Sequence, residues 1–205
     1  MIAIIDYGVG NLFSLKSSFA AIGADTVVTG DPSIIRSAEK LVLPGVGAFG
    51  DAAALLRRNE LDKLIREEAS TGKSLLGICL GMQLLFDYSL EYGQHEGLGL
   101  IPGSVRPIGD YIPQGYKIPH IGWNALRFPA GKPVSPLFRH IREGDCVYFV
   151  HSFCGAECQE SVIASAEYGA GLTAAVAHEN VYGVQFHPEK SGDVGLNILR
   201  AFCAL

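Results

Sequence analysis

The sequence predicts an α/β fold built on a doubly wound, mostly parallel sheet. Short apolar segments of strand length alternate with longer segments whose apolar residues recur every three or four positions, as in βαβ units. Glycine-rich turns follow several of the apolar segments. The chain has 205 residues, of which 48% are hydrophobic and 18% charged, so it can bury a sizeable core. We expect residues 1–205 to form a single domain.

The first half of the chain shows the clearest alternation. Its expected strands are residues 3–5, 25–28, 40–43 and 74–78. The first expected helix places four apolar residues on one face: Leu12, Leu15, Phe19 and Ile22. A long helical region after the third strand has its own inward-facing residues: Leu55, Leu61, Leu64 and Ile65. Residues 30–32, Gly-Asp-Pro, are interpreted as a turn.

The second half has a different character. Residues 93–141 contain many Gly and Pro with little helical period, and we interpret them as hairpins and edge strands covering one end of the sheet. The later expected strands are residues 147–150, 162–167, 172–177 and 181–186. The final helix is expected to bury Leu196, Leu199 and Phe202.

Composition excludes several classes of protein. The net charge is −5 and no long basic run is present, which argues against nucleic acid or an anionic membrane surface as the main partner. The N-terminus reads as a first strand and not as a signal peptide, so a cytoplasmic location is expected. Five irregularly spaced cysteines predict no disulfides, and the Cys154-x3-Cys158 spacing is attributed to chance because no second ligand pair follows. We expect no metal and no organic cofactor.

A glycine-flanked cysteine, Gly77 to Gly81 with Cys79 at its centre, resembles a nucleophile elbow with cysteine in place of serine. An apolar strand leads in, and a helical pattern over Met82 to Phe86 leads out. We expect the glycines to relieve a cramped backbone and the helix N-terminus to favour the thiolate. The alternative is a cysteine that serves only as a small core residue.

A second motif, His187-Pro188-Glu189, supplies a possible base and a carboxylate to orient it. Taken alone, a His-Pro pair is most often part of a loop. Together with Cys79 at the end of another expected strand, it predicts a Cys-His-Glu triad. A pseudoenzyme that keeps the fold is the remaining alternative.

Four loops follow expected strands and should meet at one edge of the sheet, where ligands collect. They are residues 6–11, 44–47, 79–83 and 187–190. Pro44 to Gly47 is a candidate oxyanion hole, because glycines let a backbone N–H turn toward a substrate. The N–H of Leu80 would be the second donor. Residues 6–11 lack the spacing of a dinucleotide-binding loop and are interpreted as a tight turn.

The two motifs resemble those of the class I, triad-type glutamine amidotransferases, which have a flavodoxin-like fold. Further segments resemble the glutaminase subunits of imidazole glycerol phosphate synthases within that family: residues 5–11, 44–49, 119–124, 148–152 and 183–191. This chain has Met82 where related amidotransferases more often have His, and Pro-Gly-Val-Gly where many have Pro-Gly-Gly. The resemblance covers nearly the whole chain.

The resemblance implies a role for each matching residue. Cys79 would attack the side-chain amide of glutamine, His187 would transfer protons, and Glu189 would orient His187. The N–H groups of Val46 and Leu80 would hold the oxyanion. The substrate would be bound by the following residues: Gly45, Gly47, Gln83, His151 and Ser152.

The resemblance also implies a partner, a cyclase subunit with a (β/α)8-barrel fold that uses the ammonia in histidine biosynthesis. Four residues are expected at the heterodimer interface: Asn11, His120, Trp123 and Lys190. Three other functions stay open on the sequence: a cysteine hydrolase or peptidase, an inactive regulatory subunit, and the glutaminase of a different synthase.

Overall fold

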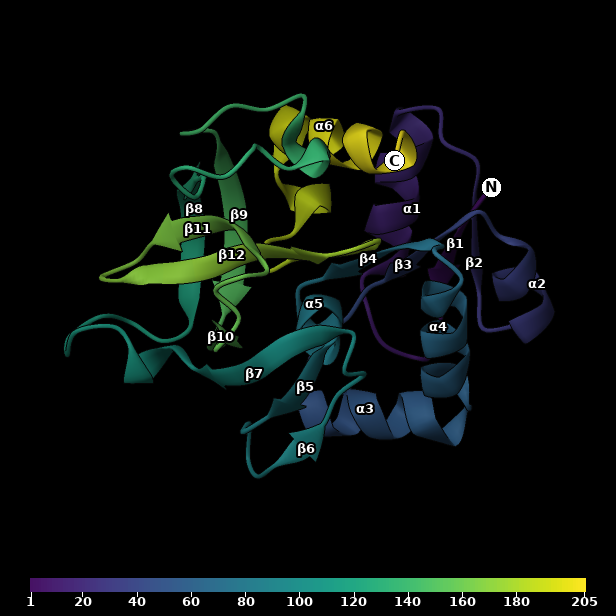
Figure 1. Cartoon of the computed structure of the whole chain (residues 1–205), viewed down its shortest axis with the longest axis horizontal. Coiled ribbons are helices and arrows are strands. Elements are labelled where there is room, and N and C mark those ends of the chain that lie inside the picture. The colour runs from purple at the N-terminus through teal and green to yellow at the C-terminus, as the bar shows by residue number, and fades with distance from the viewer.

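A nine-stranded sheet runs through the computed structural model, which describes residues 1–205 (Figure 1). The strand order is β2-β1-β3-β4-β13-β12-β11-β8-β9. The first five strands pair in parallel and have the order of a flavodoxin-like doubly wound sheet, as predicted. Their bounds are β1 Ile2–Ile5, β2 Thr26–Thr29, β3 Lys40–Leu43, β4 Ser74–Ile78 and β13 Val181–Val184.

The other four strands extend the sheet with antiparallel pairings. They are β8 His120–Arg127, β9 Cys146–His151, β11 Val162–Glu167 and β12 Gly171–His178. A second sheet, ordered β10-β7-β5-β6, lies beside the first. It consists of β5 Phe86–Ser89, β6 His95–Glu96, β7 Ile101–Pro107 and β10 Phe153–Ala156. The segment interpreted as hairpins and edge strands therefore supplies one strand to the main sheet and two to the second.

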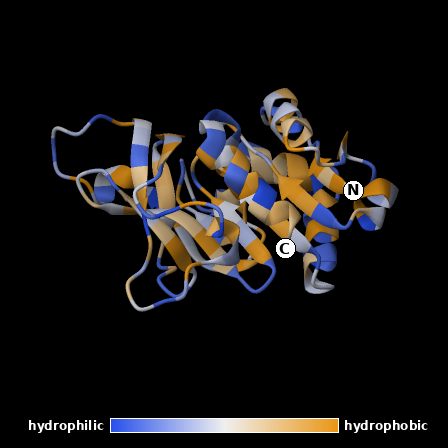
Figure 2. Ribbon diagram, turned by 90° about the horizontal axis from the view of Figure 1, so that it is seen from above, coloured by the Kyte–Doolittle hydropathy of each residue, from blue (hydrophilic) through white to orange (hydrophobic).

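Helices cover both faces of the parallel strands (Figure 1). One face is covered by α1 Leu12–Ala21, α6 Gly192–Cys203 and the 3-10 turn η2 Pro136–Phe138. The other is covered by α2 Pro32–Ser37, α3 Phe49–Arg58, α4 Leu61–Ser70 and α5 Leu80–Leu84. The two 3-10 turns η1 Ile108–Asp110 and η3 Pro188–Lys190 complete the elements. Apolar side chains from these helices and the sheet form one core cluster on each face, and Figure 2 shows the apolar residues along these elements.

Three local expectations about helices need correction. Residues 32–37 form α2 and not only a turn, because Pro32 suits a first helical turn and Asp31 accepts a hydrogen bond from Ser33 N at 2.7 Å. The long helical region is two helices, separated where Glu60 adopts a left-handed conformation (φ 56°). The helix after Cys79 has only five residues, and the chain re-enters a strand at Phe86. No helix combines the length and apolar character needed to cross a bilayer.

Candidate functional site

Cys79 occupies a strained turn between β4 and α5, with φ 55° and ψ −112°. Such backbone strain in a non-glycine residue costs about 1–3 kcal/mol and concentrates at functional sites. The flanking glycines serve packing: a Cβ at Gly77 would lie 2.6 Å from the Gly81 carbonyl oxygen, and one at Gly81 would overlap the Leu43 carbonyl. The strain therefore falls on Cys79 itself. Because α5 is one turn long, its dipole contributes less to the thiolate than a full helix would.

His187 and Glu189 form a buried pair just beyond β13, which ends at Val184. Nδ1 of His187 lies 2.7 Å from Oε1 of Glu189, and the two side chains are 4% and 3% exposed. Burial by itself lowers the pKa of His187, but hydrogen bonds to Cys79 and Glu189 and the charges of both groups raise it to about 9. The His187 imidazole thus interacts with Cys79 as well as with the Glu189 carboxylate, and the triad stays a prediction.

The raised pKa of His187 predicts how stability depends on pH. Because the pKa in the folded chain, about 9, lies above the ordinary value of 6.5, the stabilisation is fully present below pH 6.5 and is lost as the pH rises through 9. We expect the urea-measured free energy of unfolding of the wild type to fall relative to that of His187→Asn, by up to about 3 kcal/mol across this window. A difference that stays constant between the two proteins over the window contradicts this assignment.

A cavity of about 390 Å³ opens beside Cys79. Nine of its lining residues are among the predicted site or interface residues: Val46, Gly47, Cys79, Leu80, Gln83, His151, Ser152, His187 and Lys190. The other four were not identified from the sequence: Glu91, Pro119, Val150 and Phe153. Gly45 lies outside the cavity wall, packed closely against Gly81, Leu80 and the Tyr7 hydroxyl. The residues that line the cavity come from loops in both halves of the chain.

Two backbone donors on the cavity wall have no acceptor within the chain, the N–H groups of Val46 and Leu80. Val46 is 43% exposed and is followed by Gly47 with φ 94°. The loop is held at its start, where the Tyr7 hydroxyl donates to the Pro44 carbonyl at 2.8 Å. Both N–H groups are therefore available to a ligand, and their use as an oxyanion hole stays a prediction.

Glu91 is a buried carboxylate in the cavity wall that sequence reasoning missed. It follows β5 in the second sheet, and its Oε2 accepts a hydrogen bond from Phe49 N, the first residue of α3, at 2.6 Å. Nothing in its local sequence distinguishes it from other surface acids. Only the tertiary contact between the segment after β5 and the start of α3 brings this carboxylate to the site.

Gln83 and His151 are tied to the same backbone carbonyl. Nε2 of Gln83 donates to the Phe153 carbonyl at 3.2 Å and to Oε1 of Gln185 at 3.0 Å. Nδ1 of His151 lies 2.8 Å from the Phe153 carbonyl, and burial lowers the pKa of His151 to about 4. His151 is therefore neutral near pH 7 and hydrogen-bonded within the chain. The NH2 group of Gln83 uses both of its hydrogens in bonds within the chain, so its Oε1 is the acceptor that remains for a ligand.

The predicted interface residues separate into two groups. Trp123 is 55% exposed on β8, edge-to-face with Tyr148 of β9, and the Lys190 ammonium lies 5.8 Å from the centre of the same Tyr148 ring. His120 is instead 1% exposed, with Nδ1 3.0 Å from Nε2 of His151. Its side chain therefore cannot reach a partner at the surface, and that expectation is corrected. Asn11 is partly buried at the start of α1.

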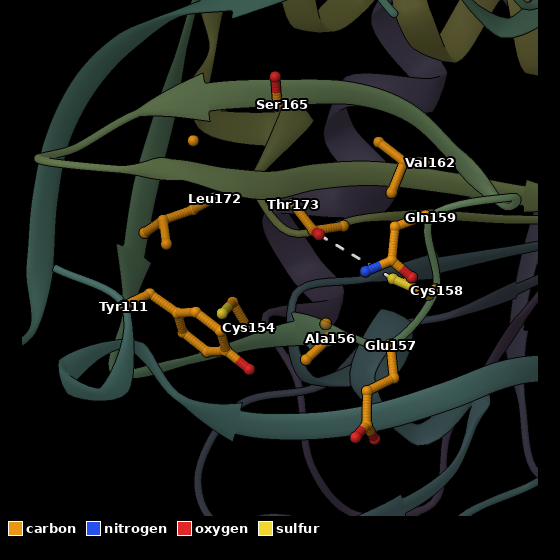
Figure 3. Close-up of a pocket in the computed structure, with 12 residues that line it drawn as sticks. Tyr111, Cys154, Ala156, Glu157, Cys158, Gln159, Val162, Ser165, Leu172 and Thr173 are labelled. Atoms are coloured by element: carbon orange, nitrogen blue, oxygen red, sulfur yellow. Dashed lines mark hydrogen bonds between the residues drawn. The ribbon is translucent and has the colours of Figure 1, made fainter.

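A second cavity, about 370 Å³, contains none of the predicted site residues (Figure 3). Its wall brings together Cys154 and Cys158, with Tyr111 and Thr173 nearby. Burial raises the pKa of the Cys154 thiol to about 12 and also raises that of Cys158. Both thiols therefore stay protonated near neutral pH and are unsuited to act as nucleophiles, unlike a cysteine paired with a histidine.

Comparisons with known proteins identify the family of the chain. A family model described as Glutamine amidotransferase class-I matches residues 3–204. The imidazole glycerol phosphate synthase subunit HisH of Sulfurimonas denitrificans is 48% identical over 204 residues, spanning 98% of this chain and 97% of that protein. The protein of the same name from Oceanobacillus iheyensis is 45% identical, with 98% of each chain covered. PurLQS from Thermotoga maritima shares the fold, with a TM-score of 0.74 at 19% identity over 99% of this chain and 97% of that chain.

Proposed function

The chain belongs to the class I glutamine amidotransferase family, and from this membership we propose that it is the glutaminase subunit of an imidazole glycerol phosphate synthase. It hydrolyses glutamine to glutamate and ammonia for histidine biosynthesis in the cytoplasm. Residues 1–205 act as one glutaminase domain. The observation that carries the proposal is the strained Cys79 in contact with the buried His187–Glu189 pair, on a cavity with two free backbone donors.

The proposed reaction begins with the Cys79 thiolate, formed by proton transfer to His187. The sulfur attacks the side-chain carbonyl carbon of glutamine, and the resulting oxyanion is held by the N–H groups of Val46 and Leu80. His187 then gives its proton to the departing ammonia, which leaves a glutamyl thioester on Cys79. Water, deprotonated by His187, attacks the thioester, and the carbon–sulfur bond breaks to release glutamate and restore the cysteine.

The cavity wall offers complementary groups for the amino-acid end of glutamine. The free Oε1 of Gln83 and the carboxylate of Glu91 suit an α-ammonium group. Backbone groups around His151 and Ser152 are placed for the α-carboxylate. Gly47 has no side chain, which leaves room for the reacting carbonyl of glutamine. Gly45 fixes the loop by packing against Gly81 and Leu80.

The proposed partner is a cyclase subunit with a (β/α)8-barrel fold, which combines the ammonia with a phosphoribulosyl-formimino carboxamide ribonucleotide. The products are imidazole glycerol phosphate and an aminoimidazole carboxamide ribotide. The exposed face of β8 and β9 supports a docking site there, because Ile121 and Trp123 are 59% and 55% exposed. Pro119, Val150 and Lys190 connect this face to the cavity, so ammonia formed at Cys79 lies close to it.

The function is tested by capturing the partner from the native host and measuring glutamine turnover with and without it. We expect the captured cyclase to stimulate release of ammonia. Cleavage of peptides by the isolated chain, or capture of a different synthase, contradicts the proposal.

Trp123→Ala should weaken heterodimer formation while the isolated subunit keeps its fold. A large exposed aromatic side chain at an interface commonly contributes about 2 kcal/mol or more, so we expect a roughly 30-fold increase in Kd. Trp123 is the only tryptophan of the chain, so its fluorescence emission should also shift when the partner is added.

Val134→Ala is the matched control, because Val134 is 53% exposed on another part of the surface. It should leave the Kd unchanged. An unchanged Kd for Trp123→Ala, with no emission shift in the wild type, places the interface elsewhere.

A further inference from the structure

Gln185 lies directly beside the reactive sulfur but outside the cavity. The parallel pairing of β4 and β13 aligns Ile78 with Val184, and the Cys79 N–H donates to the Val184 carbonyl at 2.8 Å. Gln185, the next residue, is fully buried, and its Nε2 lies 3.8 Å from Sγ of Cys79. The register of the sheet therefore fixes a side-chain amide next to the nucleophile.

The hydrogen bonds of Gln83 determine which end of the Gln185 amide faces the sulfur. The Phe153 carbonyl can only accept, so Gln83 must direct its NH2 group toward that carbonyl. The same NH2 group lies 3.0 Å from Oε1 of Gln185, which therefore accepts. With its oxygen used in this way, Gln185 presents its own NH2 group to Cys79.

We propose that the Gln185 side-chain amide is a catalytic hydrogen-bond donor to the Cys79 sulfur. It stabilises the thiolate before attack and again when the carbon–sulfur bond of the thioester intermediate breaks and the electron pair returns to sulfur. A donor to an ionised acceptor in a buried site forms a strong hydrogen bond. This role suits the structure because α5 is only one turn long and contributes little dipole of its own. The inference rests on the proposed glutaminase function.

Two substitutions distinguish hydrogen-bond donation by the Gln185 amide from the packing of its side chain. Gln185→Met keeps the length of the side chain but has no donor, whereas Gln185→Glu keeps an acceptor for Gln83 and removes the donor to sulfur. For each variant, the rate of Cys79 alkylation by iodoacetamide is measured from pH 5 to pH 10 by mass spectrometry of the Cys79 peptide. Gln159→Met, the same exchange at a glutamine of the second cavity, is the matched control (Figure 3).

We expect the midpoint of the alkylation profile to rise by about one to two pH units in both Gln185 variants and to stay unchanged in Gln159→Met. In the heterodimer, kcat for glutamine should fall by about 10- to 100-fold, with KM changed much less, because Gln185 does not line the cavity. A purely structural role would lower the melting temperature without moving the midpoint. Unchanged midpoints in both folded variants overturn the proposal.

The wild type supplies an independent measurement should a variant fail to fold. The side-chain amide resonances of Gln185 should shift with the ionisation of Cys79 and should lose that shift in Cys79→Ala. Amide resonances that do not respond to pH also overturn the proposal. Because alkylation needs no turnover, these outcomes are distinct from failure of the glutaminase assignment, which turnover by Cys79→Ala would reveal.

Discussion

Cys79→Ala and Cys79→Ser should abolish glutamine-dependent synthesis by the heterodimer, with glutamine hydrolysis reduced by at least about 10⁴-fold. The reason is that neither side chain can form the thioester at a useful rate. Ammonia-dependent synthesis should be nearly unaffected, because the triad only produces ammonia and the partner consumes it. The measurement is product formation with glutamine or with ammonium salt as the nitrogen source.

The other two triad residues provide graded controls for this result. His187→Asn should resemble the cysteine variants, because the proton acceptor is lost. Glu189→Gln should be milder, since an amide can still hold the imidazole by a hydrogen bond to Nδ1. Substantial glutamine hydrolysis by Cys79→Ala, or loss of ammonia-dependent synthesis in a folded complex, contradicts the triad assignment.

The isolated subunit should be a poor glutaminase that its partner activates by about 100- to 1000-fold, the value of one oxyanion-hole donor. In the structure, the first part of the loop at residues 44–47 is packed and the part at Val46 and Gly47 is not. Gly45 is packed against Gly81 and the Pro44 carbonyl is held by Tyr7, whereas Val46 is exposed and Gly47 has open space around it. Partner binding can supply the differential energy that fixes the Val46 N–H toward the oxyanion. The measurement is glutamine turnover by the purified chain, alone and with the partner and its nucleotide substrate.

Gly47→Ala tests the proposed loop directly, because Gly47 has φ 94° and a side chain there is strained although space is available. We expect it to reduce the activation by the partner. Gly131→Ala is the matched control, with φ 76° and open space on another loop, and should change stability only slightly. Full activity of the isolated wild-type chain excludes gating by this loop.

Local sequence was sufficient to predict several strands and the positions of two candidate site residues, because these depend on residues close together in the chain. The predicted strands at 40–43 and 162–167 coincide with β3 and β11, because short apolar or alternating runs between turn residues specify strands. The positions of Cys79 and His187 followed from the same reasoning, since residues just after parallel strands meet at one sheet edge.

Tertiary structure decided the features that depend on residues far apart in the chain. The sequence predicts His120 at the interface with Trp123, but its side chain is buried. Its ring stacks on Tyr168 and Phe149 and lies within hydrogen-bond distance of His151, and all three are distant in the sequence. Glu91 reaches the site only through its hydrogen bond to the start of α3, and Gln185 only through the register of β13 against β4. The sequence alone was enough to predict the nucleophile, the base and its carboxylate, because short motifs encode them. Only the folded chain decided which polar groups surround them, because those contacts join segments with no local pattern in common.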